Sequence, residues 1–340
     1  MTVPDLITRP RGSAVATAIA ELLDPSLVQY ERVIEAKLRR TLFLGLGGRG
    51  TSLVRSTRAA WTSLFRTDYI PGIEFAGIDL DAMGADDPGA STSVRLPSGR
   101  FLQIPSYSPR EVGERMKTND PRYRPLVTAG VLADQLIAAG SESTDEGARQ
   151  RPAVSFVAAW LAYAKIVEFL DGLLRTINNA GRWEACGRGQ FASGFQVIVA
   201  ASPCGGVGRG LMSALLPYLL RDLTRTMEGA HVRCVPLLVD EYEGDVPNPV
   251  KARAETYSLL LELRHYGRPE TTYTITRGPG GPVLRDTNPP YDLILPLDCS
   301  GGFLNEQEAL RWGGEVLVGL STADLSVVTG RMVNLEEEWK

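Results

Sequence analysis

The sequence has little histidine, few cysteines and no long hydrophobic run. Its 340 residues include only two histidines, so histidine-based metal sites and Ser-His-Asp catalysis have almost no side chains to use. The four cysteines form no CxxC pair, which argues against structural zinc and against a disulfide framework. No window reaches roughly 18 uninterrupted apolar residues, and the first residues lack an apolar signal core. We therefore expect a reduced, cytoplasmic protein with no membrane span and no secretory signal.

The sequence also lacks an excess of positive charge. Its net charge is −4 and its pI is about 5.5, so no global basic field would attract nucleic acid. Hydrophobic residues make up 44% and charged residues 22%, which is typical of a soluble globular protein. The length is sufficient for two ordinary domains or for one large one. These values argue against nucleic acid as the main partner.

What is present is a regular alternation of strand-like and helix-like segments. Apolar runs of strand length alternate with amphipathic helical patterns over roughly 220 residues. This alternation predicts an α/β fold in which helices cover both faces of a mostly parallel sheet, followed by a smaller C-terminal α+β part. The predicted strands are 41–50 with its glycine turn, 73–81, 194–201 and 231–240, and the predicted helices are 51–65, 152–177, 209–227 and 248–267.

Two glycine clusters each follow a predicted strand and open a predicted helix. The first reads Gly45-Leu-Gly-Gly-Arg-Gly50 and the second reads Cys204-Gly-Gly-Val-Gly-Arg-Gly210. Unpaired amides and the helix dipole favour an anion at such a helix start, most often a phosphate, if no Cβ intervenes. One such loop is common in α/β proteins and is compatible with a mere tight turn. Two loops indicate phosphates held from two sides, without the lysine of a Walker motif.

These features together resemble the tubulin/FtsZ superfamily, and within it the divergent bacterial tubulin-like proteins. The resemblance lies in the first glycine loop, in the acidic end of the second strand and in the late glycine loop after "VIVAA". The family pattern G-G-G-T-G-[ST]-G stands here as Gly205 to Gly210 preceded by Cys204. The resemblance implies a GTP- or GDP-binding protein that uses Mg²⁺ and acts by assembling with itself or with other proteins.

The resemblance also implies a division of the chain. Residues 1–39 would be an N-terminal helical extension. Residues 40–267 would be the tubulin-like nucleotide-binding domain, ending with the family's central helix. Residues 268–340 would be a reduced second domain, with a buried strand at 291–298 and a helix at 305–320.

Nucleotide-binding positions carry over from the family in five segments, with no metal ligand supplied directly by the protein. For two of these segments an alternative interpretation remains. The loop with Ala148 and Arg149 would be an ordinary solvated loop, and Glu255, at the position that reads guanine in the family, would be an exposed acid on a helix. The positions are Gly47, Gly48, Arg49, Gly50, Thr51 and Ser52 in the first loop; Asp79 and Asp81 after the second strand; Ala148 and Arg149 before the third helix; Gly205, Gly206, Val207, Gly208, Arg209 and Gly210 in the signature loop; and Glu255 on the central helix.

The sequence departs from the family at positions that concern chemistry. Val207 replaces a threonine and removes a hydroxyl donor, whereas Arg209 replaces a serine or threonine and would either bind phosphate or block the pocket. The family's catalytic N-x-D-x-x-[DE] pattern is missing after the predicted central helix, where only Glu270 is acidic. A looser form of that pattern occurs at 334–338. We therefore expect at most a slow GTPase.

Two other functions remain open at this stage. The chain would be a tubulin-fold scaffold that binds no nucleotide, with residues 91–151 as its partner surface, if Val207 and Arg209 have abolished the site. It would be a Rossmann-type enzyme that uses NAD or S-adenosylmethionine if Asp79 or Asp81 binds a ribose. Against the second alternative, these acids lie about 30 residues beyond the glycines. In the dinucleotide-binding motif of Rossmann enzymes, the acidic residue that binds the ribose lies about 20 residues beyond them.

Overall fold

A computed structural model describes the protein at residues 39–65, 72–82, 95–140, 148, 151–179, 195–212, 215–225, 227, 230–238, 249–268, 270–298 and 305–322. The predicted N-terminal extension falls almost entirely outside these ranges. Arg149 and the acidic stretch at 334–338 also lie outside them.

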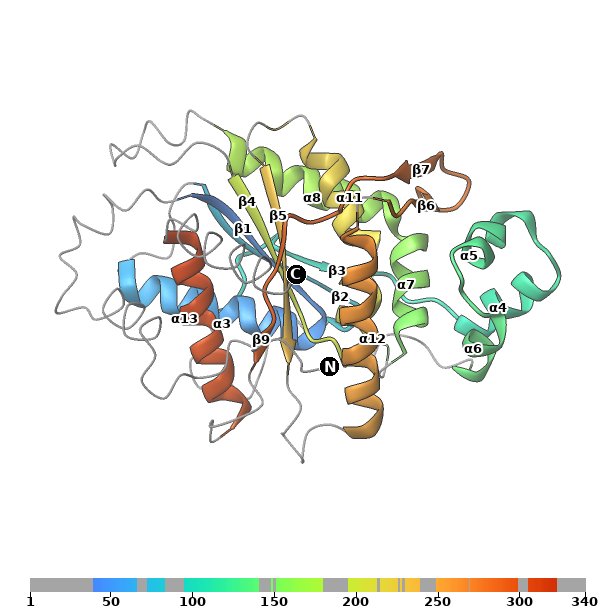
Figure 1. The fold of residues 1–340 in the computed structure, drawn as a ribbon, viewed down its shortest axis with the longest axis horizontal. Helices are drawn as coiled ribbons and strands as arrows, with labels where there is room; N and C mark the ends of the chain where they lie inside the picture. The colour runs from blue at the N-terminus through green and yellow to red at the C-terminus, as the bar shows by residue number, and fades with distance from the viewer. Residues whose placement is uncertain are drawn as a thin grey trace.

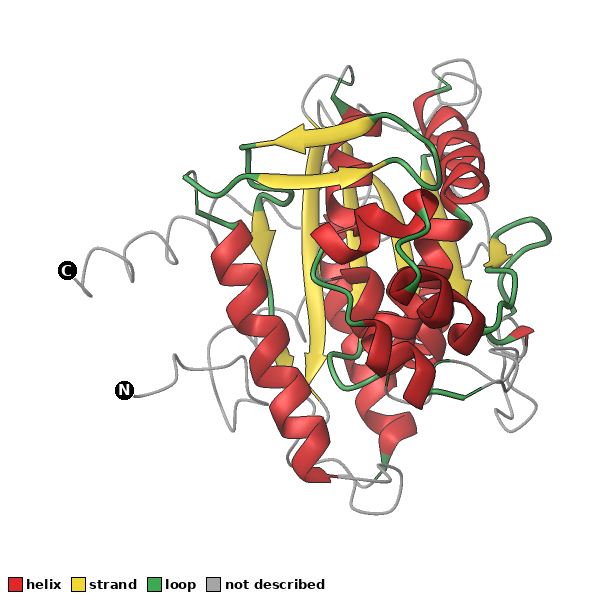
Figure 2. Cartoon of the chain, turned by 90° about the vertical axis from the view of Figure 1, so that its right-hand side faces the viewer, coloured by secondary structure: helices red, strands yellow, loops and turns green. Residues whose placement is uncertain are grey.

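A seven-stranded sheet forms the centre of the molecule (Figures 1 and 2), in the order β3-β2-β1-β4-β5-β8, with β9 also paired to β5. Every pairing in it is parallel. The predicted α/β fold is thus confirmed. The strands are β1 (Arg40–Leu46), β2 (Ile73–Asp79), β3 (Phe101–Gln103), β4 (Phe195–Ala201), β5 (Ala230–Leu238), β8 (Leu293–Ile294) and β9 (Leu297–Asp298).

Helices cover both faces of this sheet (Figure 1). One face carries α3 (Gly47–Phe65) and α13 (Glu306–Thr322). The other carries α7 (Pro152–Leu161), α8 (Tyr163–Asn178), α10 (Gly206–Met212), α11 (Leu215–Thr224) and α12 (Pro249–Tyr266).

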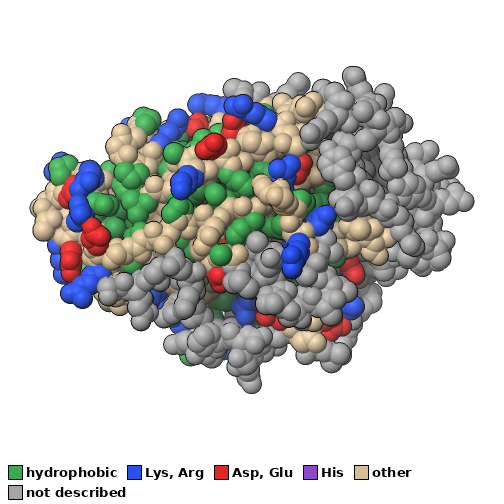
Figure 3. All heavy atoms as spheres, turned by 180° about the vertical axis from the view of Figure 1, so that it is seen from behind, with side chains coloured by type: hydrophobic (Ala, Val, Ile, Leu, Met, Phe, Trp, Pro, Cys, Tyr) green, Lys and Arg blue, Asp and Glu red, His purple; other side chains and the backbone are tan. Residues whose placement is uncertain are grey.

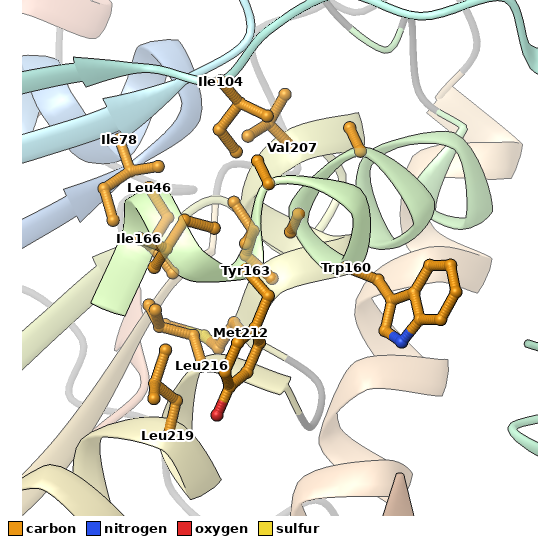
Figure 4. Close-up of a cluster of buried hydrophobic side chains, with 14 of the residues drawn as sticks. Leu46, Ile78, Ile104, Trp160, Tyr163, Ile166, Val207, Met212, Leu216 and Leu219 are labelled. Carbon is orange, nitrogen blue, oxygen red and sulfur yellow. The ribbon is translucent and has the colours of Figure 1, made fainter. Parts of the chain in front are cut away.

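The apolar sequence of β1 follows from this burial on both faces. Successive side chains of a strand point to opposite faces, so Phe43 packs in the core under α3 and α13. Leu42, Leu44 and Leu46 pack in the core under α7, α8 and α10. Figure 4 shows part of the second core, in which Leu46 and Ile78 of the sheet face side chains of the covering helices. A strand buried on both faces needs a continuous apolar run rather than alternation.

The predicted helix 152–177 is divided in two. α7 and α8 meet at Ala162 and are bent by 77° relative to each other. Both halves bury residues in the same core: α8 packs on β1 and β2, and α7 packs on α10. Within the described residues, no single helix is long and apolar enough to span a membrane, and α7 with α8 passes that test only as a bent pair.

Short helices fill the region between β3 and α7. They are α4 (Pro109–Lys117), η2 (Pro121–Tyr123), α5 (Arg124–Thr128) and α6 (Ala133–Ala138), and they form the lobe at the right of Figure 1. α4 begins at Pro109 because Ser108 caps it by accepting a hydrogen bond from the amide of Glu111.

The last part of the chain returns to the sheet. A hairpin of β6 (Tyr273–Thr276) and β7 (Val283–Asp286) follows α12, and then β8 and β9 pair with β5. α12 is therefore a crossover connection between strands of one sheet. Although we assigned 268–340 to a reduced second domain, residues 293–298 extend the main sheet and α13 packs on α3. The domain boundaries stay a prediction.

The rear surface of the molecule mixes side chains of all kinds. Figure 3 shows hydrophobic side chains gathered along a band across the middle of this face. Around the band, on the described part of the face, basic and acidic side chains are interspersed rather than separated by sign.

Candidate functional site

The two glycine loops meet at the carboxyl edge of the sheet. β1 and β4 are neighbours in register, with Leu46 opposite Ala201, so both loops begin at the same level. Gly47 adopts φ +70, in the left-handed region that favours glycine. A Cβ on Gly47 would lie 3.0 Å from the amide nitrogen of Gly208 and 3.2 Å from Cβ of Val207. The starts of α3 and α10 are therefore in contact.

Several glycines in these loops are required for packing of the chain on itself. A Cβ on Gly50 would collide with the carbonyl of Ala200, and one on Gly210 would collide with Ser155 of α7. A Cβ on Gly206 would lie 2.6 Å from Cβ of Ala148. These positions exclude side chains because neighbouring helices and strands occupy the space.

At two glycines, in contrast, a Cβ would fit without a close contact. A Cβ on Gly48 would meet only Oδ2 of Asp79, at 3.9 Å, and one on Gly205 would meet only atoms of Ser202, at 3.5 Å or more. Gly48 is exposed, and Gly205 is half-buried. Gly48 lies in the first turn of α3, which contains no acidic residue, so the helix dipole there is not offset within the turn. These two positions are the ones in the loops where a small group could be added without displacing a neighbouring residue.

Carboxylates lie beside the first loop, at the end of β2. Oδ1 of Asp79 accepts hydrogen bonds from the amides of Leu80 at 2.7 Å and Asp81 at 3.4 Å. Asp79 is buried, and this burial raises the pKa of its carboxyl to about 6. Asp81 is half-buried. Carboxylate oxygens, together with phosphate oxygens and water, are the ligands that Mg²⁺ prefers.

Arg49 connects the first loop to two other segments. Its Nε donates to Oε1 of Glu306 at 2.9 Å, and its Nη1 donates to Sγ of Cys204 at 3.6 Å. Sγ of Cys204 in turn lies 3.1 Å from Oγ of Ser202. Glu306 is the first residue of α13. The sequence does not reveal that Glu306 lies at this site, because it is 257 positions from Arg49 and belongs to no motif.

Comparison with known proteins identifies the family. A family model described as tubulin-like matches residues 42–304. The chain belongs to the tubulin-like family. Among solved structures, it is similar to CetZ2 of Haloferax volcanii, a GTPγS-bound protofilament, with 12% identity, a TM-score of 0.47 and coverage of 85% of this chain and 62% of that one.

A second similar structure is a GTPγS-form protofilament of TubZ from Bacillus thuringiensis serovar israelensis. Identity is 11%, the TM-score is 0.46, and the alignment covers 84% of this chain and 57% of the other. The chain thus matches less than two thirds of the length of either structure. No curated protein matches it.

Three residues of the tubulin-like signature segments are engaged in packing. The side chain of Val207 is buried in the core beside Ile104 (Figure 4). Thr51 is fully buried, with its side chain 2.9 Å from where a Cβ would stand on Gly77. Oγ of Ser52 accepts a hydrogen bond from Arg55 at 2.9 Å.

The side chain of Arg209 is hydrogen-bonded to residues of α12 and does not project as a free cation into the space beside Gly205. Its guanidinium donates to the carboxylate of Glu262 and, at 3.1 Å, to Oγ of Ser258. Glu255, the predicted base-reading residue, lies 3.7 Å from Nε of the same arginine. The structure therefore brings both predicted residues together on the side of α10 that faces α12.

The remaining predicted residues lie at the margins of the site. Ala148 packs against Gly206. Glu270 is exposed and follows α12, which crosses from the end of β5 to the start of the next parallel strand. Glu270 therefore lies toward the amino edge of the sheet, opposite the glycine loops. In the described part of the chain, no cluster of three or more His, Cys, Asp or Glu residues could hold a metal.

Proposed function

We propose that this tubulin-like chain binds a guanine nucleotide, with its phosphates on the first turns of α3 and α10. The observation that carries the proposal is the contact between two helix starts that each leave one open glycine, Gly48 and Gly205. Helix starts present unpaired amides and a positive dipole end, and side-by-side starts suit a chain of several phosphates.

Metal binding is the next part of the proposal. Asp79 and Asp81 would face the terminal phosphate and its Mg²⁺, which supplies positive charge that neutralises the phosphate oxygens. Asp79 is the more constrained of the two, since the amides of Leu80 and Asp81 fix one of its oxygens. Oδ2 is the atom nearest the open side of Gly48.

Membership of the tubulin-like family supports guanine as the base and assembly with further copies of the chain as parts of this proposal. Glu255 is not needed for this proposal, because it lies beside Arg209. Glu306, in contrast, contacts the first loop through Arg49. Family membership also leaves no support for the Rossmann-type enzyme.

A scaffold without nucleotide is the second candidate, and one observation favours it. Arg49, a cation in the first loop, is already paired with Glu306. A phosphate arriving there would meet a neighbouring carboxylate and would have to compete for the guanidinium. Val207 and Arg209 no longer favour the scaffold, because their side chains face the core and α12.

One experiment separates the two candidates. The purified protein is unfolded and any released nucleotide is identified by chromatography, and nucleotide-free protein is then titrated with GTP, GDP and ATP in the presence of Mg²⁺. Saturable binding of GTP and GDP, with weaker binding of ATP, supports the proposed function. Protein that carries no nucleotide and binds none in titration is the scaffold.

A further inference from the structure

Arg209 is a buried arginine at a position where the family signature has a small hydroxyl residue. Its side chain is only 6% exposed. It lies in the first turns of α10, and its own amide donates to the carbonyl of Gly205 at 3.0 Å, which closes the first turn after the loop. The backbone of Arg209 therefore contacts the second glycine loop directly, whereas its side chain points away from the loop toward α12.

The partners of the guanidinium all come from α12. Nη1 donates to Oε2 of Glu262 at 2.8 Å, Nη2 donates to Oε1 of the same carboxylate, and Nη2 also donates to Oγ of Ser258. Glu255, Ser258 and Glu262 are spaced by three and four positions, so they share one face of the helix. A two-pronged contact between a guanidinium and a carboxylate fixes both distance and orientation.

This arrangement leaves no simple way for Arg209 to bind a phosphate as well. Both terminal nitrogens are committed to α12, and Nε faces Glu255 at 3.7 Å. Turning the guanidinium toward the loop would leave Glu262 without its buried partner. The arginine that replaces the family's hydroxyl residue thus binds α12 instead of a phosphate.

We propose, on the basis of the nucleotide site proposed above, that Arg209 is a positioning residue. It clamps α10 to α12 through Glu262 and so sets the position of the second glycine loop for the phosphates, without touching them. The loop and α12 then move as one unit.

A double-mutant cycle in nucleotide affinity tests this. The variants are Arg209→Met, Glu262→Gln and the two combined, with Arg264→Met as control because Arg264 is an exposed arginine elsewhere on α12. We expect each single variant to weaken GTP binding by about tenfold and the double variant to be no weaker than either, because they break one interaction. Arg209→Lys should restore part of the affinity.

The dependence of nucleotide affinity on salt distinguishes a positioning role of Arg209 from a direct contact with phosphate. If Arg209 only positions the loop, the dependence of affinity on ionic strength should be the same in Arg209→Met as in the wild type. A weaker salt dependence, or a Glu262→Gln variant that binds as tightly as the wild type while Arg209→Met does not, would show a direct contact with phosphate and overturn the proposal.

Hydrogen exchange of the nucleotide-free protein separates this proposal from the proposed function. Amides of residues 206–212 should exchange faster in both single variants, whether or not the wild type binds nucleotide. Unchanged exchange in both would overturn the clamp even if GTP binds. If Arg209→Met does not fold, Glu262→Gln and Ser258→Ala provide the same comparison with smaller perturbations.

Discussion

The guanidinium of Arg49 and the carboxylate of Glu306 join the first glycine loop to the start of α13, at an Nε–Oε1 distance of 2.9 Å. We predict that Glu306→Gln binds nucleotide more tightly, by about fivefold, because a negative charge beside the phosphates is removed and Arg49 is released. Titration calorimetry measures the change, with Glu308→Gln in the same helix turn as control. Weaker binding would mean that Glu306 instead holds Arg49 in its binding position.

Substituting Gly48 or Gly205 should lower nucleotide affinity without lowering the stability of the fold. In Gly48→Ala and Gly205→Ala the added methyl enters the space proposed for phosphate, so nucleotide affinity should fall by about tenfold or more, roughly 1.4 kcal/mol. Thermal unfolding should be little changed, because neither methyl meets another atom closely. Gly172→Ala is the matched control, since a Cβ there meets nothing within 4 Å and lies on α8. If both variants bind like the wild type, the loops are only turns.

The packed glycines should respond in stability. Gly210→Ala forces a methyl against Ser155 and the backbone of α7, so we expect the free energy of unfolding to fall by roughly 1–3 kcal/mol or more. Denaturant unfolding followed by circular dichroism measures it, with Gly319→Ala on α13 as control because a Cβ there is unobstructed. A Gly210→Ala protein as stable as the wild type would contradict the close packing of α7 against α10.

The carboxyl of Asp79 should make stability depend on pH. Its pKa is raised to about 6 by burial, so the folded state favours the protonated form. The stabilising contribution of protonation is complete below the unfolded pKa, near 4, and is lost as pH rises through about 6. The wild type should therefore lose stability relative to Asp79→Asn between about pH 4 and pH 7. Unfolding curves across this range measure the difference, and Asp171→Asn serves as control. Parallel pH profiles for wild type and Asp79→Asn would rule out the raised pKa.

Hydrolysis, if it occurs, should need a second copy of the chain. Glu270 lies toward the edge of the sheet opposite the glycine loops, so it can reach only a nucleotide held by a neighbour. Water must be oriented for attack on the γ-phosphate, and loss of that group costs orders of magnitude in rate. We expect phosphate release below roughly one per minute per subunit, rising with protein concentration. Fast release that is independent of concentration would place the catalytic acid within one chain, with Asp79 or Asp81 as candidates.

The sequence by itself determined the fold class and the edge of the sheet at which the two glycine loops meet. Parallel strands end at a common edge, so two glycine loops that each follow a strand had to lie at that edge, and β1 and β4 are indeed neighbours. Continuous apolar runs such as residues 41–46 correctly indicated strands buried on both faces. These features depend on local pattern and chain direction, which the sequence records directly.

Only the tertiary structure decided what each residue of the loops does. From the sequence, Arg209 had two roles open to it, and the structure gives it a third, because its partner Glu262 lies 53 positions away on another helix. The glycines look alike in the sequence, yet Gly206 is packed against Ala148 while Gly205 is open. Glu306 reaches Arg49 only because β8 and β9 rejoin the sheet before α13 begins. Contacts of this kind depend on how distant segments pack, and local sequence pattern does not specify that.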